Sequence, residues 1–169
     1  MQQGNYGENY QSHLIEQYKL FVEMADRISA RRGQTNSFYI SLLSALLALL
    51  SLVIDKDLFS GPASVLLFFT ALIGLALCLT WYVNIQSYRQ LNGLKFQVIH
   101  EIEALLPFPC YKREWDLLKE QRGKQKKQYI QLTTVEKYVP LIFTVPYIGL
   151  LLYTLLVFIG VIGLPASTP

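Results

Sequence analysis

The sequence predicts an all-α membrane protein with three transmembrane helices, an amphipathic N-terminal helix and long cytoplasmic helices. Its hydrophobic content of 52% and mean hydropathy of +0.29 are too high for an ordinary soluble domain. The chain also contains three uncharged apolar runs, each long enough for a spanning helix, which needs about 18 such residues. We place the three spans at residues 37–54, 62–83 and 139–163.

Residues 1–35 are predicted to form a cytoplasmic amphipathic helix ahead of the first span. Between Tyr10 and Arg32, apolar side chains recur at helical spacing. Gly33 is expected to end this helix as a C-terminal cap. The polar face carries charges of both signs, which favours packing on other cytoplasmic helices over a position on the membrane surface. The apolar positions are Leu14, Tyr18, Phe21, Val22, Ala25 and Ile28.

The second span is predicted to continue as one helix into the cytoplasm. No proline lies between Pro62 and Pro107, and apolar side chains keep their helical spacing up to Leu105. Pro107 and Pro109 then end the helix, because proline lacks the N–H donor and forces the preceding residue into an extended conformation. A second cytoplasmic helix is expected at residues 111–135.

The distribution of cations predicts which segments face the cytoplasm. Residues 1–35 contain four Lys and Arg, and residues 86–137 contain ten. The transmembrane hairpin, 36–85, contains one, and the segment 138–169, with the third span and a short external tail, contains none. By the positive-inside rule the N-terminus and the helical region 86–137 are therefore cytoplasmic.

The sequence contains no pattern typical of an enzyme. It lacks the glycine-rich phosphate-binding motifs, H-E-x-x-H and C-x-x-C, so we expect no catalytic residues, no metal and no cofactor. His100, Glu101 and Glu103 are close in sequence, but side chains at these spacings on one helix do not converge on one ion. No Asp, Glu, Lys, Arg or His lies inside a predicted span, which argues against a pump. With three spans per chain, conduction would require a homo-oligomer.

Basic side chains beside the membrane and in the second cytoplasmic helix suit an anionic partner. One interpretation is a solvated face, or contact with the anionic lipids of the bilayer. The alternative is a binding site for an anionic ligand, because a basic surface concentrates anions. The candidate residues for anion contact are Arg31, Arg32, Arg89, Lys119, Arg122, Lys124, Lys126 and Lys127.

Small residues form one stripe along the first span, at Ser37, Ser41, Ser44, Ala48 and Ser51. Steps of three and four residues place all five on one face of a helix. Small residues let helices approach closely, and hydroxyls can bond across the contact. The same face repeated around a symmetry axis would instead give a narrow, wettable pore wall. A row of small residues at Thr70, Gly74 and Cys78 of the second span makes packing within one chain the alternative to a pore wall.

The chain also resembles a known family of small membrane proteins. An amphipathic helix that ends in SARRGQTNSFY (Ser29 to Tyr39), a short-loop hairpin of two spans and long cytoplasmic helices are similar to the SLATT family of bacterial conflict systems. The resemblance covers about residues 10–105, and the third span lies outside the family's two-span core. It implies a pore-forming inner-membrane effector of antiphage defence, encoded beside nucleotide-second-messenger synthetases or other sensors. It implies no catalytic residue.

Two functional hypotheses follow. The first is an oligomeric pore or channel in the bacterial inner membrane, opened by a nucleotide second messenger or a cytoplasmic sensor protein bound to its cytoplasmic helices. Opening would disrupt the membrane potential. The alternative is a non-conducting membrane adaptor that recruits a soluble enzyme through the same helices.

Overall fold

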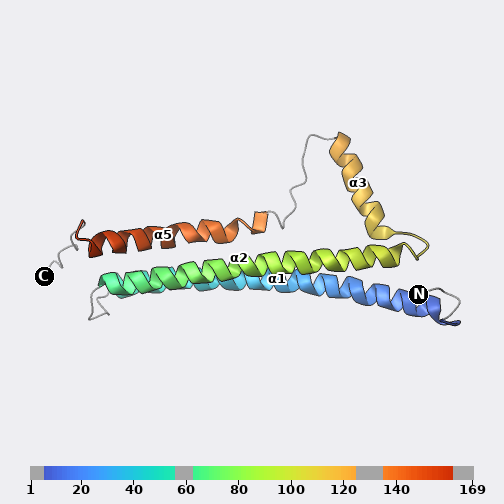
Figure 1. Ribbon diagram of the computed structural model, residues 1–169, viewed down its shortest axis with the longest axis horizontal. Helices are drawn as coiled ribbons and strands as arrows, with labels where there is room; N and C mark the ends of the chain where they lie inside the picture. The colour runs from blue at the N-terminus through green and yellow to red at the C-terminus, as the bar shows by residue number, and fades with distance from the viewer. Residues whose placement is uncertain (1–5, 56–62, 125–134, 162–169) are drawn as a thin grey trace. The chain divides into compact units, whose positions relative to one another are not determined.

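The computed structural model describes residues 6–55, 63–124 and 135–161. The helices it defines there are α1 (Tyr10–Asp55), α2 (Ala63–Glu103), α3 (Cys110–Lys124) and α5 (Val139–Phe158) (Figure 1). Three of them, α1, α2 and α5, are long and apolar enough to cross a membrane. The described residues contain no strand, so the predicted all-α membrane fold is confirmed.

Helix α1 joins the predicted N-terminal helix and the first span without a break. The expected cap at Gly33 is therefore wrong, since this residue lies in the interior of a helix of 46 residues. No proline occurs between Tyr10 and Asp55, and one glycine costs a helix only about 1 kcal/mol relative to alanine. Ending the helix there would leave several backbone groups without partners.

Helix α2 ends close to the predicted place, at Glu103, two residues before Leu105 and ahead of Pro107. The helix predicted at residues 111–135 begins at Cys110 and is described as far as Lys124. The remainder of the predicted helix, 125–134, lies outside the described residues.

Helix α5 is shorter than the predicted third span and ends at Phe158 instead of residue 163. Gly160 has a φ of 79° and follows the helix in a left-handed conformation. The Gly160 N–H donates to the Val157 carbonyl at 3.1 Å, and the Val161 N–H donates to the Leu156 carbonyl at 3.0 Å. These two bonds form a Schellman motif, which stops the helix and satisfies carbonyls that would otherwise lack a donor.

The chain divides into two compact units, which we call unit 1 (residues 1–33 and 86–132) and unit 2 (34–85 and 133–169). In unit 2, α5 runs beside α1 and α2 (Figure 1). A buried cluster joins the three helices there. Its members are Tyr39 and Leu43 of α1, Cys78, Trp81 and Ile85 of α2, and Tyr147 of α5.

Polar bonds fix the register of the helices in unit 2. The Trp81 indole N–H donates to the Asn36 side-chain oxygen at 2.9 Å, and the Trp81 ring stacks on Tyr39 with centroids 5.6 Å apart. The Tyr147 hydroxyl donates to the Leu43 carbonyl at 2.8 Å. Gly74 permits the close approach of α5, because a Cβ at this position would overlap the Tyr147 ring. Each side chain therefore helps to hold one helix against another.

In unit 1, the first part of α1 packs on the last part of α2. The six apolar residues predicted for the face of this helix are all buried or half-buried. The Lys95 ammonium of α2 lies 5.3 Å from the centroid of the Phe21 ring of α1. The predicted packing of the amphipathic helix on another helix is thus confirmed.

Candidate functional site

A buried carboxylate, Glu103, holds the three helices of unit 1 together at the last residue of α2. The side chain is 1% exposed. The Tyr18 hydroxyl of α1 donates to it at 3.0 Å, and His100 Nδ1 lies 3.3 Å from Oε2. The backbone N–H groups of Tyr111 and Lys112 donate to it at 2.8 and 3.3 Å. Glu103 therefore links α1 to α2 and also caps the first turn of α3, where N–H groups have no partner within their own helix.

The hydrogen bonds decide the ionisation of this group. Burial by itself raises the pKa of Glu103, but the bonds from Tyr111, His100, Tyr18 and Lys112 outweigh burial, and the pKa lies below 4.5. Burial and the bond to Glu103 raise the pKa of Tyr18 above its ordinary value. At neutral pH the carboxylate is thus charged and the phenol remains a donor. We call Glu103 and its four partners the carboxylate joint.

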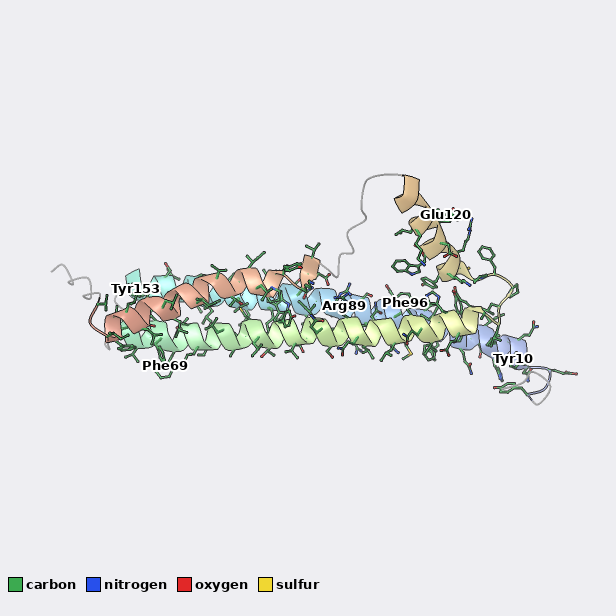
Figure 2. All side chains as sticks on the ribbon, turned by 45° about the horizontal axis from the view of Figure 1, so that its top comes forward. Tyr10, Phe69, Arg89, Phe96, Glu120 and Tyr153 are labelled. Atoms are coloured by element: carbon green, nitrogen blue, oxygen red, sulfur yellow. The ribbon has the colours of Figure 1, made fainter. Side chains whose placement is uncertain are left out.

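An aromatic contact supports the joint. Phe96 of α2 meets Tyr111 of α3 edge to face, with ring centroids 5.6 Å apart. Figure 2 labels Phe96 on the side of α2 that faces the start of α3. The start of α3 is therefore held both by hydrogen bonds and by a ring contact.

One cavity of unit 1 lies beside this joint and carries basic side chains. It has a volume of about 570 Å³ and lies between the end of α2 and one face of α3. The lining residues are His100, Ala104, Pro109, Lys112, Trp115, Asp116 and Lys119. We call it the basic cavity. It offers two ammonium groups and an indole ring to a bound molecule.

The structure gathers few of the cations predicted to contact an anion. Lys119 lines the basic cavity, whereas Arg31, Arg32 and Arg89 do not. Arg31 and Arg89 are exposed, and Arg32 is half-buried. Arg122 and Lys124 belong to the last turn of α3, and Lys126 and Lys127 lie outside the described residues.

Sequence reasoning missed the carboxylate joint and most of the basic cavity. His100 and Glu103 were considered as metal ligands, yet they bond to one another across one helical turn. The usable signal was a carboxylate placed just before a proline-containing turn that leads into a helix. Lys112 and Trp115 also share the face of α3 with Lys119, at spacings of three, four and seven residues.

The stripe of small residues lies on the exposed face of α1 in unit 2. All five members, Ser37, Ser41, Ser44, Ala48 and Ser51, are exposed. The buried face of the same segment instead carries Tyr39, Leu43 and Leu50. Within the described residues, the five side chains of the stripe are thus not buried against Thr70, Gly74 and Cys78 of the same chain. Those positions face other partners, such as the Tyr147 ring at Gly74.

The exposed stripe is available to lipid or to another copy of the chain. Ser51 also borders an apolar groove of about 530 Å³, lined by residues of all three helices that include Leu67 and Pro146. Within residues 37–54 of α1, the large exposed side chains, such as Phe38 and Leu49, are hydrocarbon. The stripe is thus a hydroxyl-bearing face on an otherwise apolar surface.

Comparison with known proteins identifies the family. A search of curated proteins and a search of solved structures each found no match. A family model described as the octameric membrane protein family (8xMP) matches residues 15–157. This range includes the first two predicted spans, α5 except its last residue, the carboxylate joint and the basic cavity. With its three apolar helices, the chain is an oligomeric membrane protein, and it belongs to the octameric membrane protein family.

Proposed function

We propose that the protein assembles as a homo-octamer and forms a gated conductive path across the bacterial inner membrane, as an effector of antiphage defence. The observation that carries this proposal is the exposed hydroxyl face of α1 in unit 2. In a cyclic octamer the same face occurs once per subunit around the axis. The defence role rests on the resemblance to SLATT proteins, and no enzymatic step is part of the proposal.

The composition of the spans supports a pore over a pump. The span regions of α1, α2 and α5 contain no charged side chain, and ion-coupled pumps normally use one within the membrane. Hydroxyl groups wet a narrow path without fixing an ion by charge. A path of this kind dissipates the membrane potential and needs no other chemistry from the protein.

Gating is assigned to unit 1. By the distribution of Lys and Arg, the N-terminus and α3 belong to the cytoplasmic side. A nucleotide signal or a partner protein opens the path by binding the open state more tightly than the closed state. The carboxylate joint is the part of unit 1 through which such binding would act, because it holds the start of α3 on α1 and α2.

Ion flux from liposomes that contain the purified protein tests the proposal. The double variant Ser41→Leu with Ser44→Leu should abolish flux while the octamer remains intact by size-exclusion chromatography with light scattering. The control is Ala45→Leu, which adds one leucine side chain at an exposed position beside the stripe. Its flux should match that of the wild type.

Two results would contradict the proposal. Equal loss of flux in the double variant and in Ala45→Leu would show that the hydroxyl face has no special role. An intact octamer that conducts under no condition, including co-expression with its neighbouring genes, would favour the adaptor hypothesis.

A further inference from the structure

Three cavities in the described part of unit 1 differ in charge. The first, beside Tyr6 and His13, is lined by a single carboxylate, Glu101. The second contains three carboxylates, those of Glu23, Asp26 and Glu114, and one lysine. The basic cavity contains two lysines, one histidine and one carboxylate. An anion is therefore repelled by the first two cavities and attracted by the third.

The two lysines of the basic cavity form no ion pair with the carboxylate of Asp116, which also lines it. Within the part of the chain that the structure describes, no carboxylate lies within ion-pair distance of Lys112 or Lys119. Both are exposed. They are seven residues apart on α3, so they stand two turns apart on one face with Trp115 and Asp116 between them. Two free ammonium groups thus flank an indole ring.

We propose that the basic cavity binds a nucleotide, with the base against Trp115 and the phosphate held by Lys112 and Lys119. Proteins that bind single-stranded nucleic acids hold bases by stacking on aromatic rings beside positively charged groups, and any base can stack in this way. Asp116 offers an acceptor for an amino group of the base, and the volume suits a small ligand. An anionic lipid headgroup supplies a phosphate but no base. Only the binding of a nucleotide should therefore depend on Trp115.

Two residues of the basic cavity also belong to the carboxylate joint. His100 lines the cavity and bonds to Glu103 through Nδ1. Lys112 lines it as well, and its backbone N–H donates to the same carboxylate. A phosphate at these side chains therefore acts on the residues that attach α3 to α2. Nucleotide binding stands on the cavity alone, whereas its part in opening the path rests on the proposed function.

Isothermal titration of the full-length protein in detergent with AMP tests the site. We expect AMP to bind more tightly than inorganic phosphate, and adenosine to bind weakly. The double variant Lys112→Gln with Lys119→Gln should weaken the affinity for AMP by at least about tenfold, because each substitution removes a charge-assisted contact with the phosphate. Replacing both by arginine should retain binding. Trp115→Ala should weaken the affinity for AMP but leave the affinity for inorganic phosphate unchanged.

Matched controls lie on the same helix but outside the cavity. Arg113 pairs with Glu120 at 3.6 Å, and Leu117 is exposed. Arg113→Gln and Leu117→Ala should bind AMP as the wild type does. Every variant is first shown to remain octameric by light scattering, which excludes loss of folding as the cause.

The outcomes separate this inference from the proposed function. The proposal is overturned if AMP binds no better than inorganic phosphate. It is also overturned if phosphatidylglycerol vesicles displace AMP but GMP does not, since the site would then bind a lipid headgroup. Absence of AMP binding at millimolar concentration would also overturn it. Binding with the expected pattern in a protein that conducts no ions would sustain the nucleotide site and refute only the pore.

Discussion

Replacing Glu103 by alanine should release the start of α3 from unit 1. The change removes a carboxylate that accepts from two backbone N–H groups and from the Tyr18 hydroxyl. It leaves all three donors without this partner. A hydrogen bond to a charged group contributes about 1.5–3 kcal/mol, and loss of a helix cap costs about 1 kcal/mol. Glu103 is buried, but Tyr18 and Tyr111 are only half-buried, so water can replace part of these bonds in the variant. We therefore expect the free energy of local opening to fall by about 2 kcal/mol.

Hydrogen exchange followed by mass spectrometry measures this opening in the intact oligomer. A loss of about 2 kcal/mol corresponds to exchange about 30-fold faster in the peptide that contains the first turn of α3. Glu101→Gln is the matched control, because Glu101 is exposed on the same helix and forms none of the bonds of the joint. Its exchange should equal that of the wild type.

The reasoning is refuted if Glu103→Ala leaves exchange at the start of α3 unchanged. It is refuted equally if Glu101→Gln accelerates exchange as much, since the effect would then reflect charge on α2 and not the capping bonds. Acceleration throughout unit 2 as well would indicate general unfolding and would contradict a local role for the joint.

Three further predictions follow from single contacts. Since the pKa of Glu103 is lowered in the folded state, the carboxylate stabilises α3 above pH 4.5, and this contribution disappears as the pH falls below that value. The ratio of the hydrogen-exchange rates of Glu103→Gln and the wild type should therefore approach one in acid. Gly74→Ala should reduce stability in detergent by about 1–3 kcal/mol, because the new methyl group overlaps the Tyr147 ring, whereas Gly149→Ala, which meets open space, should not. Tyr147→Phe should cost about 1 kcal/mol, measured by thermal unfolding, because the Leu43 carbonyl loses its buried donor.

The positions of the spans were predictable from the sequence, although α1 continues through Gly33 and α5 ends at Phe158 instead of residue 163. An apolar run without charge has few stable conformations other than a helix in a bilayer, since every backbone group must find its partner within the segment. The end of α2 was predictable from Pro107 and Pro109, because proline acts through its own covalent geometry. The buried side of the N-terminal helix was predictable from the spacing of its apolar residues. All of these properties are local to a segment.

The contacts between segments were decided only by the tertiary structure. Tyr18 and Glu103 are 85 residues apart and meet because α1 and α2 pack in one particular register. The exposure of the serine stripe depends on the rotation of α1, which the stacking of Tyr39 on Trp81 and the bond from Tyr147 to Leu43 fix. Hydropathy does not specify rotation on an apolar helix, because nearly every face is hydrocarbon. Shape and a few hydrogen bonds between helices specify it instead.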